Sequence, residues 1–246
     1  MVILVNSVIY EILNSIESQG FKAYLVGGYV RDYILGFLNL DVDIVTNAPV
    51  NILLNLFSDN NPKVFQYNTI KFACNEFHID IAQMREEHFD GNKTIVNFTD
   101  DLQKDFTRRD FTMNAIYLDK DLNFFDFSNC ISDCKNLTLN FIGNSNLKCY
   151  EDPIRFIRGI YLILKYNIKD YTSLNGISIT QKDFKRCSHV ALINIIYKIL
   201  KLNKNEEFVN LLDKYNLYQE LFDKRPNSFE LTPKEFLIEC EYLFIV

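Results

Sequence analysis

The most restrictive feature of the sequence is a glycine pair, Gly27 and Gly28, followed by two aspartates, Asp41 and Asp43, that a single valine separates. In a β-strand, residues two apart point to the same face, so the two carboxylates are expected side by side while Val42 faces the core. Like charges this close repel each other unless a cation lies between them. Oxygen donors of this kind suit Mg²⁺.

The glycine pair follows an apolar run and precedes a stretch of helical character. Bare backbone N–H groups at the start of a helix, together with the helix dipole, favour a phosphate group. Arg31 follows one helical turn later, and Gly36 is expected to end the helix. Singly, Gly-Gly is most often a turn and Asp-x-Asp is usually a solvated strand edge. In the order strand, Gly-Gly, helix, Asp-x-Asp, they predict a site for a metal ion and a nucleotide.

Length and composition are typical of a globular protein. The 246 residues, 48% of them hydrophobic, suffice for one large domain or two small ones. The first residues show no basic leader, and no apolar run approaches the roughly 20 residues that span a bilayer, so we expect a cytoplasmic protein without a membrane partner. Six cysteines without a CxxC pair and only three histidines argue against zinc frameworks and disulfide scaffolds.

The hydrophobic pattern changes near residue 150, which predicts two domains, 1–150 and 151–246. The first alternates between β-type and helical spacing, typical of an α+β mixed sheet with helices, and the second is helical throughout. The strands are expected at 23–26, 41–45, 64–67, 69–74, 77–82, 115–118 and 124–127, and the helices of the first domain at 6–18, 28–35 and 49–57. The polar stretch from Glu86 to Asn97 predicts a mobile loop.

Acidic residues are concentrated in the first domain. It holds 12 basic and 19 acidic residues, whereas the second holds 14 and 13. A protein that coats nucleic acid non-specifically should be basic, so any RNA contact is expected to be local. The tight basic cluster of the second domain consists of Lys182, Lys185 and Arg186.

Two further groups of residues in the first domain carry potential chemistry. Asp80 alternates with Ile79 and Ile81, so it can reach the two aspartates as a third carboxylate, although a single strand aspartate is more often merely exposed. Before a later expected strand stand Arg108, Arg109 and Asp110. Paired arginines can clamp phosphates and an aspartate can accept from a ribose hydroxyl, but an Arg-Arg pair alone is usually a solvated turn.

The helical half opens with Asp152, Arg155 and Arg158 around Pro153. Asp152 is equally well explained as a helix cap. The spacing nevertheless places the three charged side chains along one edge of a helix, where an acceptor beside donors can read the pairing edge of a base.

Three motifs, G-G-x-V-R-D-x-x-L-G-x-x-x-x-D-x-D, R-R-D-F-T-x-N-A and E-D-P-x-R-x-x-R, resemble those of the class II (bacterial-type) tRNA nucleotidyltransferase and poly(A) polymerase family. The resemblance covers residues 24–158 and continues more weakly to about residue 222. It implies a polymerase-β-like nucleotidyltransferase head, a helical neck and a partial body. The activity implied is addition of C, C and A to the 3′ end of tRNA from CTP and ATP, without a nucleic-acid template.

The resemblance also implies residue roles. Asp41 and Asp43 would be catalytic ligands of Mg²⁺, with Asp80 as a third catalytic carboxylate. The nucleotide-binding set would comprise Gly27, Gly28 and Arg31 at the triphosphate, Arg108, Arg109 and Asp110 at ribose and phosphate, and Asp152, Arg155 and Arg158 as an amino-acid template for C or A. Two Mg²⁺ ions would activate the RNA 3′-hydroxyl and stabilise the leaving pyrophosphate.

The sequence departs from the family pattern at three places. Gly91-Asn92-Lys93 replaces the Arg-Arg-Pro of many relatives, and Tyr161 replaces an arginine of the template helix. The chain also ends at Val246, short of the usual family length. We therefore expect tRNA to be held mainly by its acceptor end, or with help from a homodimer or a helper chain. Alternatives are a poly(A) polymerase, an enzyme that adds only A or only CC, and a non-enzymatic RNA-binding remnant.

Overall fold

The computed structural model describes residues 6–91 and 93–244. The chain divides after Asn136 into two compact units, 1–136 and 137–246. The observed architecture, a mixed sheet with helices followed by a helical region, confirms the predicted α+β class. The functional boundary expected near residue 150 stays a prediction, because compactness alone does not delimit the parts that act together.

The first unit is built around a seven-stranded sheet in the order β3-β4-β5-β2-β1-β8-β9. Its elements are α1 (Ser7–Glu17), β1 (Ala23–Val26), α2 (Gly27–Ile34), β2 (Asp41–Thr46), α3 (Val50–Leu56), η1 (Ser58–Asn60), β3 (Lys63–Phe65), β4 (Thr69–Cys74), β5 (Phe77–Gln83), β6 (Arg85–Phe89), β7 (Thr94–Phe98), α4 (Leu102–Arg108), η2 (Thr112–Asn114), β8 (Tyr117–Leu118), β9 (Phe124–Phe125) and α5 (Cys130–Lys135). Within this sheet β2 and β5 run parallel, and the other neighbours run antiparallel.

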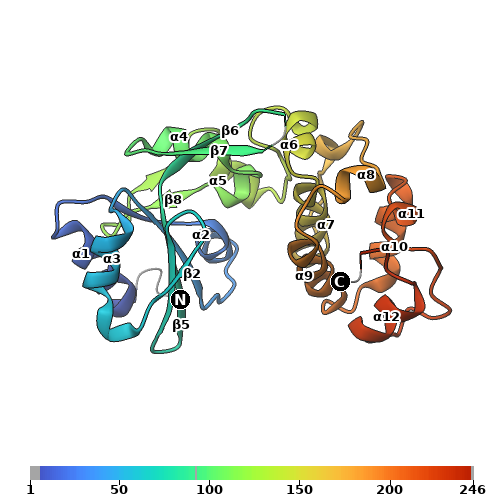
Figure 1. Ribbon diagram of the computed structural model, residues 1–246, viewed down its shortest axis with the longest axis horizontal. Coiled ribbons are helices and arrows are strands. Elements are labelled where there is room, and N and C mark those ends of the chain that lie inside the picture. Colours follow the sequence, from blue (N-terminus) through green and yellow to red (C-terminus); the bar gives the residue numbers. More distant parts are fainter. Residues whose placement is uncertain (1–5, 92, 245–246) are drawn as a thin grey trace. The chain divides into compact units, whose positions relative to one another are not determined.

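Buried and more exposed residues alternate along β4 and β5, so one face of these strands is buried. Ile44, Ile70 and Ile81, on neighbouring strands, are at most 1% exposed. The helices α1 and α3 lie on one side of β2 and β5, and α2 lies on the other (Figure 1). At the end of α3, Phe57 stacks on Phe72 of β4 with ring centroids 5.1 Å apart. The apolar residues therefore fix which side of the sheet can carry polar groups.

The expected mobile loop at residues 86–97 is wrong, because two strands occupy most of this segment. The strands β6 and β7 form a separate antiparallel hairpin, in which Glu87 pairs with Val96. Asn92 itself lies outside the described residues. The sequence of β6 lacks the apolar alternation of a typical strand because its polar side chains pair with other charged groups. Glu87 pairs with Arg85 at 2.8 Å, and Glu86 pairs with Lys104 of α4 at 3.3 Å.

The second unit is helical, as predicted. Its helices are α6 (Ser145–Glu151), α7 (Ile154–Tyr166), η3 (Thr172–Leu174), α8 (Gln181–Phe184), α9 (His189–Leu200), α10 (Asn205–Lys214), α11 (Tyr218–Leu221) and α12 (Pro233–Glu239). α7 and α9 pack side by side (Figure 1). Phe208, Phe222 and Phe236 are fully buried and form an aromatic cluster with one another. Within residues 6–91 and 93–244, no helix is both long and apolar enough to span a membrane.

Candidate nucleotide and metal site

The sheet register brings the predicted carboxylates together on adjacent strands. Val26 of β1 pairs with Asp43 of β2, and Asp43 pairs with Asp80 of β5. Asp80 in turn pairs with Lys71 of β4 and forms an ion pair with its ammonium group. Directly paired residues point to the same face, and Asp41 shares that face because it lies two residues before Asp43. The three carboxylates therefore lie near one another on the sheet face opposite Ile44 and Ile81.

The glycine pair lies against Asp43. Gly27 has a φ of +73°, and a Cβ atom there would lie 2.7 Å from Asp43 Oδ2. The backbone N–H of Gly28 donates a hydrogen bond to the Asp43 carboxylate. No side chain caps the start of α2. The turn thus needs glycine for two reasons: a left-handed conformation and close approach to a carboxylate.

The electrostatics of this area suit a hard cation. Burial and the neighbouring Asp80 carboxylate raise the pKa of Asp43 to about 6. A divalent ion would relieve the repulsion between Asp43 and Asp80, which adds to the effect of burial. The two carboxylates of Asp41 and Asp43 are donors of the right kind. The donor set therefore fits Mg²⁺ in chemical type. In the described part of the chain, however, no three His, Cys, Asp or Glu side chains already form a metal-binding group.

Arg31 is buried and linked to two other motif residues. Its guanidinium donates to Asp32 Oδ1 at 2.9 and 3.0 Å and to Asn114 Oδ1 at 2.5 Å. Asp32 also accepts from Asn39 at 2.9 Å. Arg31 is only 5% exposed. These bonds tie α2 to the R-R-D-F-T-x-N-A motif, so the position of Arg31 next to Gly28 is fixed; its predicted contact with a triphosphate stays a prediction.

The two arginines of the second motif converge on a residue that sequence reasoning missed. Asp105 of α4 is fully buried and accepts from Arg108 at 2.7 Å and from Arg109 at 2.8 Å. It also accepts from the Tyr117 hydroxyl at 2.9 Å. The arginines hold the pKa of Asp105 at about 2, despite its burial. The sequence signal for these ion pairs was the spacing: Arg108 and Arg109 follow Asp105 by three and four residues, which places them next to it on a helix.

The remaining member of this motif has a local partner. One carboxylate oxygen of Asp110 accepts from the backbone N–H of Phe111 at 2.8 Å. Arg108 also lies 3.7 Å from Glu87 of the hairpin. The hairpin, α4 and the arginine motif are thereby joined through charged side chains.

The predicted template residues all lie in the second unit, around the start of α7. The helix begins at Ile154, and Asp152 Oδ1 accepts from its backbone N–H at 3.0 Å, so Asp152 does stabilise the helix start. Its other oxygen accepts from Arg158 at 3.1 Å. Arg155 instead bonds Glu151 at 2.7 Å and is 8% exposed. Asp152 thus both caps the helix and pairs with Arg158.

The first unit is similar to a known family of protein domains. Residues 23–140 match the family model described as the poly A polymerase head domain. The CCA-adding enzyme of Staphylococcus epidermidis is 30% identical over 226 residues, covering 90% of this chain and 56% of the relative. The CCA-adding enzyme of Staphylococcus aureus is 31% identical over 206 residues, covering 81% of this chain and 51% of the relative. The chain thus spans little more than half the length of these relatives.

Solved structures show the same fold. The CCA-adding enzyme of Bacillus stearothermophilus in complex with CTP superposes with a TM-score of 0.75 at 22% identity, covering 96% of this chain and 57% of that one. That of Thermotoga maritima complexed with tRNA gives 0.67 at 22% identity, with coverages of 89% and 52%. The match to the poly A polymerase head domain and the relatives at 30–31% identity, together with the three motifs, assign the chain to the class II tRNA nucleotidyltransferase and poly(A) polymerase family.

Proposed function

We propose that this protein adds C and A nucleotides to the 3′ end of tRNA, using CTP and ATP and no nucleic-acid template. The observation that carries the proposal is the contact between the glycine turn and Asp43, with Asp80 paired beside it. A nucleotide bound to that turn would have its phosphates next to the carboxylates. The relatives described as CCA-adding enzymes support the choice of RNA substrate.

The residues of the first unit divide the work of nucleotidyl transfer. The backbone N–H groups at the start of α2 would bind phosphate oxygens. Asp41 and Asp43 would hold Mg²⁺, which when bound supplies positive charge for activation of the 3′-hydroxyl and stabilisation of the pyrophosphate. Arg108 and Arg109, fixed by Asp105, present guanidinium groups suited to phosphate or ribose oxygens. Positioning and electrostatics account for most of the catalysis in such reactions.

Selection of the base would fall to the residues at the start of α7. Asp152 supplies an acceptor and Arg158 a donor, and their side chains are 32% and 36% exposed. Arg155 is bonded to Glu151 and, at 3.0 Å, to the Lys148 carbonyl. It would not contact the base but would fix the segment between α6 and α7 that carries Asp152. Such an acceptor–donor edge can discriminate C and A from U and G through hydrogen bonds.

Incubation with tRNA ending at its discriminator base tests the proposal. The protein should incorporate CTP, should add ATP only after CTP, and should reject UTP and GTP. Asp152→Ala should relax base choice more than it lowers total incorporation, with Glu230→Ala, an exposed acidic residue of the same unit, as a control. Unchanged discrimination between CTP and UTP in Asp152→Ala would show that Asp152 serves only as a helix cap. If the wild-type protein incorporates no nucleotide at all, the enzymatic function is rejected.

A poly(A) polymerase is the second candidate, because the matching family model carries that description. The same assay separates the two. Long extension with ATP alone would identify a poly(A) polymerase, whereas a product that stops after C, C and A supports tRNA end addition.

A further inference from the structure

The face that carries the carboxylates continues across two more strands. By the sheet register, Lys71 of β4 and Lys63 of β3 pair with each other and share the face of Asp80. Phe65, two residues after Lys63, lies on the same face, and the residue is 50% exposed. The Lys71 ammonium lies 5.4 Å from the centroid of the Phe65 ring. A cation and an exposed aromatic ring therefore adjoin the carboxylates on the side of β4.

The glycine turn adjoins the same carboxylates from the other side. The strand order is β3-β4-β5-β2-β1, and the turn follows β1. Asp43 and Asp80, on β2 and β5, thus lie between the turn and Lys71. In nucleotidyl transfer the leaving pyrophosphate and the attacking oxygen lie in line, on opposite sides of the reacting phosphorus. If the leaving pyrophosphate lies at the glycine turn, with the reacting phosphorus at the carboxylates, the attacking 3′-hydroxyl approaches from the side of β4.

We propose that Lys71 and Phe65 bind the 3′-terminal nucleotide of the RNA, with Lys71 on a backbone phosphate and Phe65 beneath a base. The inference rests on the proposed function for the direction of attack. An ammonium group is a suitable partner for a phosphate, and an aromatic ring stacks on any base. Asp80 forms an ion pair with Lys71 in the absence of RNA, and the RNA phosphate would replace Asp80 as the partner of Lys71.

Binding of RNA without nucleoside triphosphate tests the Lys71 contact. The probe is an RNA hairpin with a single-stranded 3′ overhang ending in 2-aminopurine, titrated over a salt series. Lys71→Gln should weaken binding about 5-fold at low salt and reduce the log–log salt slope by about 0.7, while Lys71→Arg should retain both. Lys22→Gln removes an exposed charge at the other end of β1 and should change neither. In incorporation assays KM for RNA should rise, whereas KM for CTP should not.

A double-mutant cycle separates this role from simple neutralisation of Asp80. If Lys71 binds phosphate, Lys71→Gln should weaken RNA binding in the Asp80→Asn background as well. If Lys71 serves only as a counterion, the effect should disappear in that background, and the proposal fails. Loss of RNA binding by Lys22→Gln to the same extent would equally overturn it.

The stacking contact has its own test. Phe65→Ala should weaken RNA binding about 5-fold or more and change the fluorescence of the terminal 2-aminopurine. Val64→Ala is the matched control, because Val64 is 54% exposed on the same strand but points to the opposite face. Equal effects of Phe65→Ala and Val64→Ala would reject the proposed stacking of a base on Phe65. If the wild-type protein adds nucleotides normally while Phe65→Ala and Lys71→Gln bind RNA unchanged, the inference fails and the proposed function stands.

Discussion

At the scale of single residues, the site depends on a close approach between backbone and carboxylate. Gly27 leaves no room for a Cβ atom beside Asp43, and Gly28 donates to the same carboxylate. Asp80 adds a second negative charge at the adjacent strand position. Together these contacts define the position of the Asp43 carboxylate and place a second carboxylate beside it.

Removal of either predicted metal ligand should abolish nucleotide addition. Asp41→Ala and Asp43→Ala should each lower kcat/KM by at least about 100-fold, because charge stabilisation of the transition state is lost. The fold should survive, since a like-charge repulsion is relieved. Asp59→Ala in η1 is an exposed acidic control and should remain active. Turnover above a few per cent of wild type in both site variants would contradict the assignment.

Gly27→Ala can be compared with a glycine that has the same backbone requirement and free space. Gly20 has a φ of +85° and no atom within 4 Å of a Cβ built there. Each Ala variant should lose about 1–2 kcal/mol of unfolding free energy from the left-handed conformation. Only Gly27→Ala displaces Asp43, so nucleotide addition should fall about 100-fold in that variant alone. Denaturant unfolding and kcat/KM, measured for both, decide the question.

At the scale of elements, α4 acts as the anchor of the arginine motif. Its Asp105 accepts from Arg108, Arg109 and Tyr117, and the helix also contacts the β6–β7 hairpin. Arg109 additionally lies over the Tyr117 ring, 5.1 Å from its centroid. Loss of this buried carboxylate would remove the acceptor that the two guanidinium groups share, which is costly where little water can replace it.

The pH dependence of stability should report this carboxylate. Its pKa is lowered from 3.8 to about 2, so its stabilisation is fully present above about pH 4 and is lost as the pH falls towards 2. Asp105→Asn should cost about 3 kcal/mol of unfolding free energy at pH 7, and less as the pH approaches 2. Asp101→Asn, an exposed N-cap substitution in the same helix, should cost little at any pH. Urea unfolding of the wild-type protein and the two variants from pH 7 to pH 2.5 measures the difference in unfolding free energy between each variant and the wild type.

At the scale of the molecule, charge differs between the two compact units. Residues 1–136 hold 11 basic and 19 acidic residues, and residues 137–246 hold 15 and 13. In the second unit Lys182 and Lys185 are exposed, whereas Arg186 pairs with Asp183 at 2.9 Å. Contact with tRNA phosphates is therefore expected to be sparse and centred on few cations.

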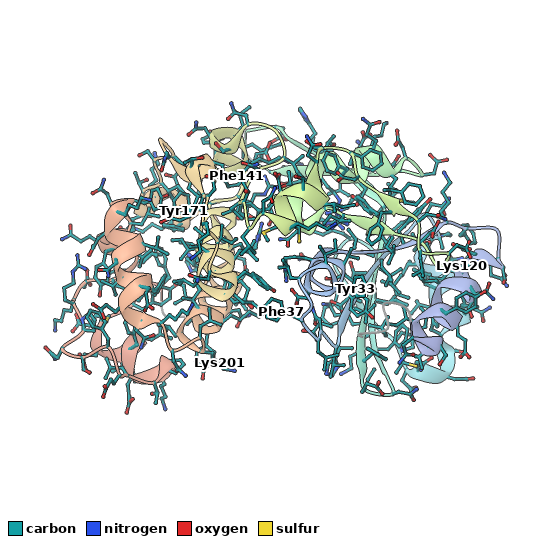
Figure 2. All side chains as sticks on the ribbon, turned by 180° about the vertical axis from the view of Figure 1, so that it is seen from behind. Tyr33, Phe37, Lys120, Phe141, Tyr171 and Lys201 are labelled. Atoms are coloured by element: carbon teal, nitrogen blue, oxygen red, sulfur yellow. The ribbon has the colours of Figure 1, made fainter. Side chains whose placement is uncertain are left out.

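A shallow salt dependence of tRNA affinity should follow. The double variant Lys182→Gln and Lys185→Gln should reduce the log–log slope by about 2, and a minihelix of acceptor and T arms should be extended about as well as full tRNA. The matched control removes Lys198 and Lys201, exposed lysines at the end of α9; Lys201 is marked at the edge of the second unit in Figure 2. A steep slope together with strong preference for intact tRNA would show that further contacts dominate binding.

Local sequence patterns determined much of this protein. Alternation placed Asp41 and Asp43 on one strand face and away from Ile44, and helical spacing correctly predicted the second half. Such patterns are readable because strand and helix periodicities depend only on neighbouring residues. The glycine turn could also be predicted, because it depends only on residues that are neighbours in the sequence.

The tertiary structure decided which patterns meet. Pairing of β2 with β5 set Asp80 beside Asp43, and pairing of β4 with β5 added Lys71. Burial of Asp105 gave the arginines their partner, and pairing of β6 with β7 turned an expected loop into a hairpin. Register and burial arise from contacts between residues distant in the chain, and a one-residue shift in strand pairing would have moved every side chain to the other face. No local pattern contains that information.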